Sequence, residues 1–352
     1  MTAPVSESSV FRVVRGTSTS RAATVLGLLL CAALVSLPAW GGAATMKLLI
    51  EMLTLLALAQ MWNLMAGYGG LVSIGQQAFV GLGAYGLYVL SDLIGLEPFV
   101  AIPIIAAVVG IFAWGTSFFV FRLEGGYFAI GTWVIAEVVR IVVSNTAAVG
   151  AGTGVSIQSL AQFGAQGRIT VTYILAVIVG LGSILVVAVI MRSRLGLALR
   201  ATRDSDIAAR SLGVDVFRTK LAVYLIASVG CAVTGAVIYM NLLRIQPNAA
   251  FGVEWSARMI FIVLIGGLGS IEGPILGTLI FIGLREALGD FGSSYLIVLG
   301  AVAIVFTLVA PRGLWGLITR RLPVTLITVQ QRLVRVAAVP SPVPGPEEPD
   351  RR

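Results

Sequence analysis

The sequence predicts an all-α, polytopic membrane protein that crosses the bilayer about ten times. Of its 352 residues, 58% are hydrophobic and 11% are charged, whereas about one quarter of a soluble domain is charged. The charges are also concentrated: residues 22–191 hold nine in 170 positions, and residues 192–220 hold ten in 29. A chain this apolar cannot cover a water-facing surface, which excludes an ordinary soluble enzyme.

The expected spans follow from the length of the apolar stretches. A helix needs about 20 apolar residues to cross about 30 Å of hydrocarbon. The stretches near this length are 22–40, 48–66, 76–91, 98–121, 127–145, 169–191, 221–243, 259–270, 273–289 and 294–310. Eight is the alternative count, because 259–270 and 273–289 are short and could be two halves of one broken helix or a re-entrant pair.

Lys and Arg residues set the expected orientation, since they accumulate on the cytoplasmic side. With the N-terminus inside, sixteen of them fall on that side and four fall outside, namely Lys47, Arg168, Arg244 and Arg258. We therefore expect cytoplasmic ends. Residues 1–21 would form an N-terminal segment, 22–318 the membrane domain, and 319–352 a tail that is disordered from about 338. A cleaved secretory signal at 22–40 is an open alternative.

The composition also limits the chemistry. The chain has no histidine, which removes the commonest metal ligand and the commonest general base at neutral pH. We expect no metal site, no catalytic site and no cofactor bound by this chain. The net charge of +8 comes from residues between apolar runs, which fits a bilayer better than nucleic acid. Cys31 and Cys231 lie in apolar runs and are interpreted as packing residues.

An internal repeat connects two glycine-rich breaks. A shift of 197 residues aligns 69–74 with 266–271, with five of six positions identical, and lays the first four spans over the last four. Such breaks either allow close helix packing or mark discontinuous helices beside a substrate pathway; both readings stay open. The pathway candidates are Gly69, Gly70, Ser73, Gln76, Gln77, Gly266, Gly267 and Ser270. For Gly81, Gly83 and Gly86, packing is favoured.

Two other features of the sequence involve charged residues whose spacing predicts local structure. Glu137 and Arg140 are three residues apart on one helix face, and we expect an intramembrane ion pair that faces other helices, with a pathway role as the alternative. In the charged segment (residues 192–220), Asp204 is a plausible N-cap and Gly213 a plausible stop for a short amphipathic helix. Such a helix suits docking into a cleft of a soluble partner, and a solvated loop is the alternative.

Several blocks of the chain together resemble the permease subunits of branched-chain amino acid ABC importers, the LivM/LivH type. The blocks are 67–85, 122–130 followed by 137–140, the loop 152–154, the charged segment, and 266–274, so the resemblance covers about 48–318. One departure is Gln76, which stands where the family often carries a histidine. In such a subunit the coupling to an ATPase would fall on Asp204, Asp206, Ile207, Ala208, Arg210, Leu212 and Gly213.

The resemblance implies a multi-subunit importer in the cell membrane. The partners would be a homologous second permease, two cytoplasmic ATPases and an extracytoplasmic substrate-binding protein. The sequence lacks the phosphate-binding pattern Gly-x-x-x-x-Gly-Lys-Ser/Thr, so the ATP would be used by the partner ATPases. The expected cargo is a branched-chain or other hydrophobic amino acid. The alternatives are a permease for urea, amides or other amino acids, and an ion-coupled secondary transporter.

Overall fold

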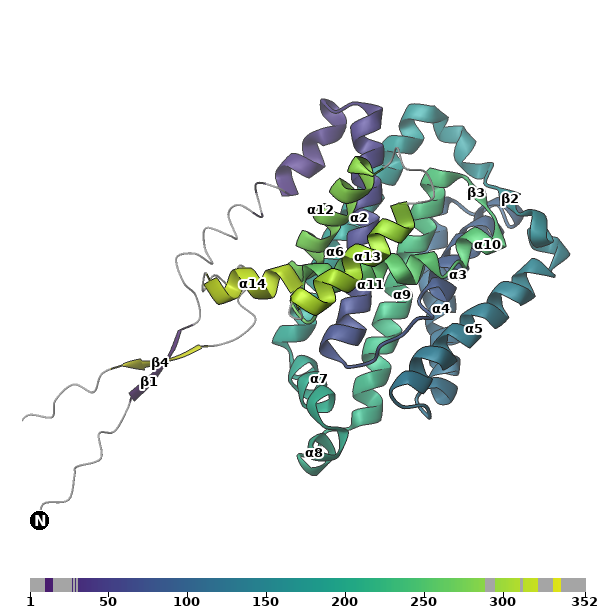
Figure 1. The fold of residues 1–352 in the computed structure, drawn as a ribbon. Coiled ribbons are helices and arrows are strands. Elements are labelled where there is room, and N and C mark those ends of the chain that lie inside the picture. The colour runs from purple at the N-terminus through teal and green to yellow at the C-terminus, as the bar shows by residue number, and fades with distance from the viewer. Residues whose placement is uncertain are drawn as a thin grey trace, which may run out of the picture.

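The protein is a bundle of helices joined by short irregular segments (Figure 1). The computed structural model describes residues 10–14, 27, 29, 31–288, 295–310, 313–321 and 332–336. The long helices are α2 (Ala43–Asn63), α4 (Pro98–Val120), α5 (Gly126–Ser144), α6 (Gly164–Arg192) and α9 (Val216–Leu242). The shorter helices are α3 (Gln77–Tyr88), α7 (Arg194–Asp204), α8 (Asp206–Ser211), α10 (Pro247–Ala250), α11 (Glu254–Gly266), α12 (Glu272–Ala287), α13 (Tyr295–Val309) and α14 (Gly313–Arg321).

Single turns and short strands complete the fold. Two π-helical turns continue α2 and α3, namely η2 (Leu64–Tyr68) and η3 (Val89–Leu93). The 3₁₀ turns are η1 (Leu37–Ala39), η4 (Ala147–Val149), η5 (Ala151–Thr153) and η6 (Ser159–Phe163). Two antiparallel strand pairs occur: β2 (Val155–Ser156) with β3 (Arg244–Ile245), and β1 (Val10–Val14) with β4 (Arg332–Val336). The second pair places segments near the two ends of the chain side by side. The tail from 338 lies outside the described residues.

Within the described residues, six stretches are long and apolar enough to cross a membrane. They are Ala43–Tyr68, Pro98–Val120, Gly126–Ser144, Ser159–Arg192, Val216–Leu242 and Pro247–Gly266. At three other expected spans, 76–91, 273–289 and 294–310, the structure has shorter helices: α3, α12 and α13 have 12, 16 and 15 residues. The first expected span, 22–40, is described only in part. The all-α membrane architecture is therefore confirmed, and the count of ten spans and the orientation of the ends stay predictions.

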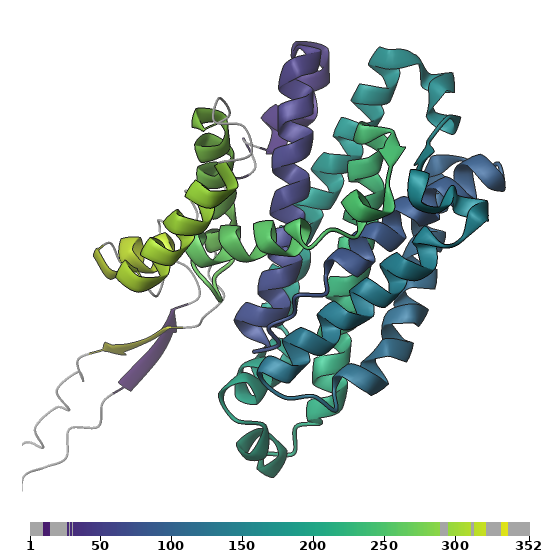
Figure 2. The same ribbon diagram turned by 45° about the vertical axis from the view of Figure 1, so that its right-hand side comes forward.

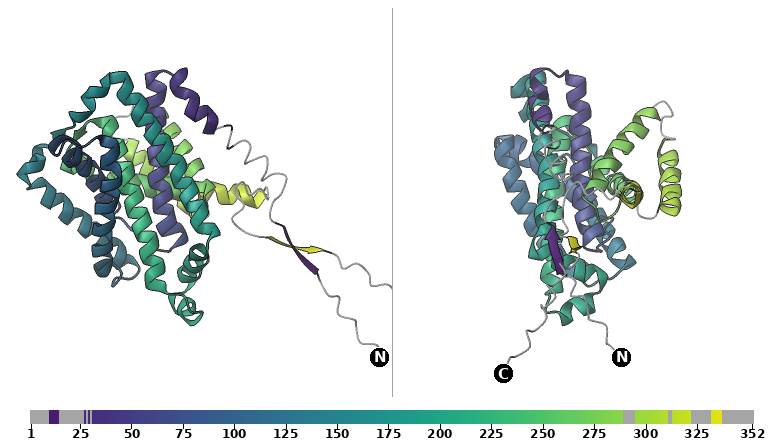
Figure 3. Two further views of the ribbon diagram at one scale, coloured as in Figure 1. Left: turned by 180° about the vertical axis from the view of Figure 1, so that it is seen from behind. Right: turned by 90° about the vertical axis from the view of Figure 1, so that its left-hand side faces the viewer.

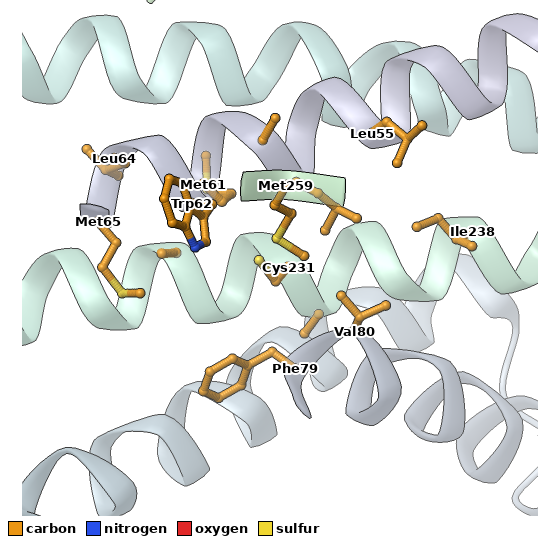
Figure 4. Close-up of a cluster of buried hydrophobic side chains, with 14 of the residues drawn as sticks. Leu55, Met61, Trp62, Leu64, Met65, Phe79, Val80, Cys231, Ile238 and Met259 are labelled. Atoms are coloured by element: carbon orange, nitrogen blue, oxygen red, sulfur yellow. The ribbon is translucent and has the colours of Figure 1, made fainter. Parts of the chain in front are cut away.

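The core of the bundle is centred on α2. Residues 53–69 are all buried, as expected for a helix that is apolar on every side. Figure 4 shows α2 and α9 facing each other through side chains such as Met61 and Cys231, with Phe79 and Met259 beside them. The outward side chains of α4, α5 and α6 are largely apolar and exposed, so this surface matches a lipid environment.

Glycines allow α3 to approach α9 closely. A Cβ atom on Gly83 would lie 1.9 Å from the carbonyl oxygen of Ala232, and one on Gly81 would lie 2.3 Å from the ring of Phe251. Real Cβ atoms do not approach other atoms so closely, and only a residue without a side chain fits there. The structure thus confirms the packing role expected for Gly81 and Gly83.

Helices α11 to α14 are arranged differently from the long helices. α11 runs across the direction of α2 and α9 (Figure 2), and α12, α13 and α14 lie to one side of the long helices (right view of Figure 3). The segment between α11 and α12 contains the second glycine break. The crossing of α11 brings this break to the end of α2, where the first break begins.

Candidate functional site

The two glycine breaks, which the internal repeat related by sequence, are in contact with each other. Past η2 the chain leaves the helix at Gly70, with a φ of 69°, and the second break has a φ of 135° at Gly267 and 75° at Gly269. These values are in the left-handed region that glycine adopts without strain. A Cβ atom on Gly67 would lie 2.7 Å from the backbone nitrogen of Gly269, so the two backbones touch.

Two buried amide side chains of α2 hold the second break. Asn63 donates from Nδ2 to the carbonyl oxygen of Ser270 at 2.8 Å and accepts at Oδ1 from the N–H of Gly269 at 2.9 Å. Gln60, one turn earlier, donates to the carbonyl oxygen of Ile271 at 2.7 Å. Both side chains are fully buried. The sequence reasoning missed them, although two amides three residues apart, inside an apolar run and just before a glycine break, were a signal.

The charged segment reaches both breaks through Arg203, near the end of α7. Its guanidinium donates a hydrogen bond to the carbonyl oxygen of Gly67. A Cβ atom on Gly269 would lie 3.1 Å from the same guanidinium, and one on Gly70 would lie 3.5 Å from Cγ of Arg203. We call the contact region of Asn63, Gly67, Arg203 and Gly269 the junction. It joins the charged segment to both halves of the repeat.

The predicted pathway residues divide into groups. Gly69 and Gly70 lie beside α7 at the junction, and Gly267 and Ser270 lie in the break that Asn63 holds. Gly266 serves helix packing, because its Cβ would lie 1.9 Å from the carbonyl oxygen of Gly273. Several backbone groups of the second break, including the N–H of Gly269 and the carbonyl of Ser270, are bonded within the protein, in keeping with the cost of an unpaired buried polar group.

Ser73, Gln76 and Gln77 are buried beyond the junction, toward α3. The carbonyl oxygen of Ser73 accepts from Nε1 of Trp62 at 2.8 Å. Oε1 of Gln77 accepts from the hydroxyl of Ser256 in α11. Nε2 of Gln76 lies 3.4 Å from the sulfur of Met65, and its Oε1 has no partner in the described part of the chain.

The charged segment forms two helices, α7 and α8, rather than one. The expected N-cap at Asp204 is wrong: Asp204 is the last residue of α7, and Ser205 caps α8 by accepting from the N–H of Ala208 at 3.2 Å. The cause is local geometry, since Ser205 has the extended backbone that a cap needs, with φ −163° and ψ 118°. Gly213 follows the helix in the left-handed region, with a φ of 81°, as expected for a stop.

Helix α8 is fixed to α9 and presents apolar side chains outward. Asp206 forms an ion pair with Lys220 of α9. Helix α8 lies at one end of the helical bundle (Figure 1). Ile207 is 81% exposed, and Leu212, which follows the helix, is 79% exposed. A cavity of about 670 Å³ separates α8 from the first break, and its lining includes Ile207, Arg210 and Gly70.

Ion pairs connect helices at the opposite end of the bundle. Nε of Arg140 lies 3.0 and 2.9 Å from the two carboxylate oxygens of Glu137, and Nη1 donates to Oδ1 of Asn248 at 2.6 Å. The pair thus joins α5 to α10. Arg285 of α12 forms a second ion pair with Glu51 of α2.

In the described part of the chain, the helical bundle has six stretches suited to crossing a bilayer, two glycine breaks in contact and a charged segment at one end, which is the architecture of a multi-pass membrane protein. The family model "Branched-chain amino acid transport system / permease component" matches residues 44–308. The chain belongs to this family.

The curated relatives agree with the family. The "High-affinity branched-chain amino acid transport system permease protein LivM" of Escherichia coli (strain K12) is 28% identical over 278 residues, which are 72% of this chain and 65% of that protein's length. The "Probable branched-chain amino acid transport permease protein LivH" of Methanocaldococcus jannaschii is 27% identical over 47% of this chain and 54% of its own length. The "Ribose import permease protein RbsC" of E. coli (strain K12) is 30% identical over 32% of this chain and 37% of its own length. No solved structure matches.

Proposed function

We propose that this chain is a membrane permease subunit of an ATP-driven importer for branched-chain or other hydrophobic amino acids. The family and the names of the LivM and LivH relatives support the cargo class. The observation that carries the mechanism is the contact of Arg203 with the first break, three residues before α8 begins at Asp206. A displacement of α8 would move Arg203 and, through it, both breaks.

The proposed partners are a homologous second permease, two cytoplasmic ATPases and an extracytoplasmic binding protein. Helix α8 would dock into an ATPase through Ile207 and, directly after the helix, Leu212. Asp206, Ala208 and Arg210 lie in the same helix, and Asp204 and Gly213 flank it. Exposed apolar side chains on a capped helix suit a groove on a soluble protein. ATP would be bound and hydrolysed by the ATPases, and this chain would bind no cofactor. Rigid-body rocking would then switch access between the two sides.

Reconstitution tests the proposal. In liposomes that contain this chain, its second permease and the ATPases, leucine uptake is expected only with ATP and loaded binding protein. Uptake by this chain alone would overturn the proposal in favour of an ion-coupled transporter.

The docking of α8 has its own test. The substitution Ile207→Asp is expected to abolish ATPase binding and uptake while membrane insertion stays intact, because it places a charge in an apolar contact. Leu197→Asp in α7 is the matched control, since Leu197 is 68% exposed and lies outside α8. Equal uptake by both variants would refute the assignment. Charge reversal at Asp206 would also break its ion pair with Lys220, so its effect could not be assigned to docking alone. Charge reversal at Arg210 leaves that pair intact and is expected to uncouple ATP hydrolysis from uptake.

A second cargo class is favoured by one observation, the similarity to the ribose import permease. In the same liposomes, ribose, urea and short amides serve as competitors. Transport of one of these in preference to leucine would assign the chain to that cargo.

A further inference from the structure

A second cavity lies at the end of the bundle farthest from α8. Its volume is about 560 Å³, within the range of small-molecule sites. It is lined by residues of the 50–55 stretch of α2 and by the last turn of α9. Helix α9 begins next to α8 and runs away from it. The rest of the lining comes from α10, the turn after it, and the first residues of α11. With α8 on the cytoplasmic side, this cavity opens to the extracytoplasmic side.

The lining of this cavity is connected to the first glycine break. Trp255 and Arg258 of α11 line the cavity. The hydroxyl of Ser256, between them in the chain, shares its one proton between the carbonyl oxygen of Ile74, at 2.9 Å, and Oε1 of Gln77. Because α11 crosses the bundle (Figure 2), a molecule in the cavity would rest on a helix that also binds the first break.

Arg258 is the cation of this cavity, and it has hydrogen-bond donors to spare. Its Nε is buried and has no partner among the described residues. Its contact with Glu254 is 3.7 Å from Nη2 to Oε2, which is longer than a hydrogen bond. The guanidinium lies over the ring of Trp255, 5.1 Å from the centroid. A planar guanidinium held by a ring, with free donors, suits the two oxygens of a carboxylate.

Glu254 is the carboxylate of this cavity that faces solvent, and among the described residues its only ion pair is the long contact with Arg258. The other acidic residue of the lining, Glu51, is bound to Arg285. The side chain of Glu254 is 65% exposed, so its oxygens can meet an ammonium group that enters from outside. Apolar side chains of α2 and α9, among them Leu55 and Ile238, complete the lining. The cavity thus offers a cation, an anion and an apolar wall within one small volume.

We propose that this cavity is an entry site for a zwitterionic α-amino acid, with Arg258 binding the carboxylate, Glu254 the ammonium group, and the apolar wall the aliphatic side chain. The inference rests on the proposed function and names a place where the cargo enters this subunit. Such a site has to release its ligand, so we expect a dissociation constant on the order of 1 mM.

The test measures protection of a single cysteine. Ala249, which lines the cavity and is exposed, is replaced by Cys in the complete importer, without ATP or binding protein. The rate of modification by a membrane-impermeant thiol reagent is measured with L-leucine, with isoamylamine, which lacks the carboxylate, and with isocaproate, which lacks the amino group. The native chain, with Cys31 and Cys231, gives the background rate.

Leucine is expected to slow the modification of Ala249→Cys, and the two analogues much less. In Arg258→Gln, the leucine concentration needed for half protection should rise about 10- to 100-fold, because a hydrogen-bonded charge is lost. Glu254→Gln should raise it as well, and Arg258→Lys should retain part of the protection. Arg244→Gln, an exposed cation outside the cavity, is the matched control and should leave protection unchanged.

Two results would overturn the inference: no protection by leucine, or equal protection in Arg258→Gln and the parent. Because the assay uses neither ATP nor binding protein, its failure is distinguishable from failure of the proposed function. Normal ATP-dependent uptake without protection would remove only the entry site. Protection without ATP-dependent uptake would keep the site and reject the ABC mechanism.

Discussion

Replacement of Asn63 by Ala tests the structure of the junction most directly. Asn63 is fully buried and satisfies two backbone groups of the second break, the N–H of Gly269 and the carbonyl of Ser270. Each buried polar group left without a partner costs about 1–3 kcal/mol. The substitution Asn63→Ala leaves two of them and should lower the free energy of unfolding by about 2–6 kcal/mol.

The matched control is Gln60→Ala, one turn earlier in the same helix. Gln60 satisfies only the carbonyl of Ile271, and its own Oε1 has no partner in the described part of the chain. Its loss should therefore cost about 1–3 kcal/mol. If packing alone determined stability, Gln60→Ala would lower the free energy of unfolding more than Asn63→Ala, because replacing glutamine by alanine removes more atoms and leaves a larger cavity. The order of the two variants thus separates hydrogen bonding from packing.

The free energy of unfolding is measured by titrating the purified chain in mixed micelles with a denaturing detergent. A third variant, Asn63→Asp, keeps the acceptor for Gly269 and opposes a carboxylate to the carbonyl of Ser270, so it should be no more stable than Asn63→Ala. If Gln60→Ala costs as much as Asn63→Ala or more, the two hydrogen bonds of Asn63 do not hold the second break, and the junction is a packing contact.

Three further predictions concern other contacts. Arg203→Gln should leave ATP hydrolysis by the assembled importer intact and lower uptake per ATP at least several-fold. Arg203→Lys should restore part of the uptake. Unchanged uptake per ATP in Arg203→Gln would exclude a role for Arg203 in transmitting the movement of α8 to the glycine breaks. Gly83→Val should prevent α3 from approaching Ala232 and abolish accumulation of folded protein in the membrane, whereas normal amounts would contradict the close packing. Glu51→Gln removes the closer of the two carboxylates at Arg285 and leaves, among the described residues, only Glu286, whose Oε2 lies 3.9 Å from Nη2 of Arg285. It should lower the free energy of unfolding by about 1–3 kcal/mol, between the values for exposed and buried pairs; the detergent titration checks this.

The local features of the sequence were enough to place most elements. Stretches of about 20 apolar residues located α2, α4, α5, α6 and α9 because crossing a bilayer fixes helix length. The turn glycine at 213 located the end of α8, because only glycine adopts its backbone without strain. The pairing of Glu137 with Arg140 follows from a spacing of three residues on one helix.

Other features depended on details that local patterns describe poorly. Asp204 and Ser205 are both good N-caps by residue type, and the extended backbone of Ser205 decided between them. The sequence predicted one helix in the charged segment but not the other, α7. Its residue Arg203 was counted only as one of many cytoplasmic cations.

The sequence by itself determined that the chain is a membrane protein and which stretches form its long helices. It also determined where glycine interrupts the helices and which segment is charged. Each of these features depends on the composition of a few neighbouring residues. Only the tertiary structure decided that the two breaks touch, that Asn63 binds a residue 206 positions away and that Arg203 binds one 136 positions away. It also placed Arg258 and Glu254 in one cavity with α2 and α9. Such contacts are chosen by the packing of whole helices, and no pattern within a single helix specifies its neighbours.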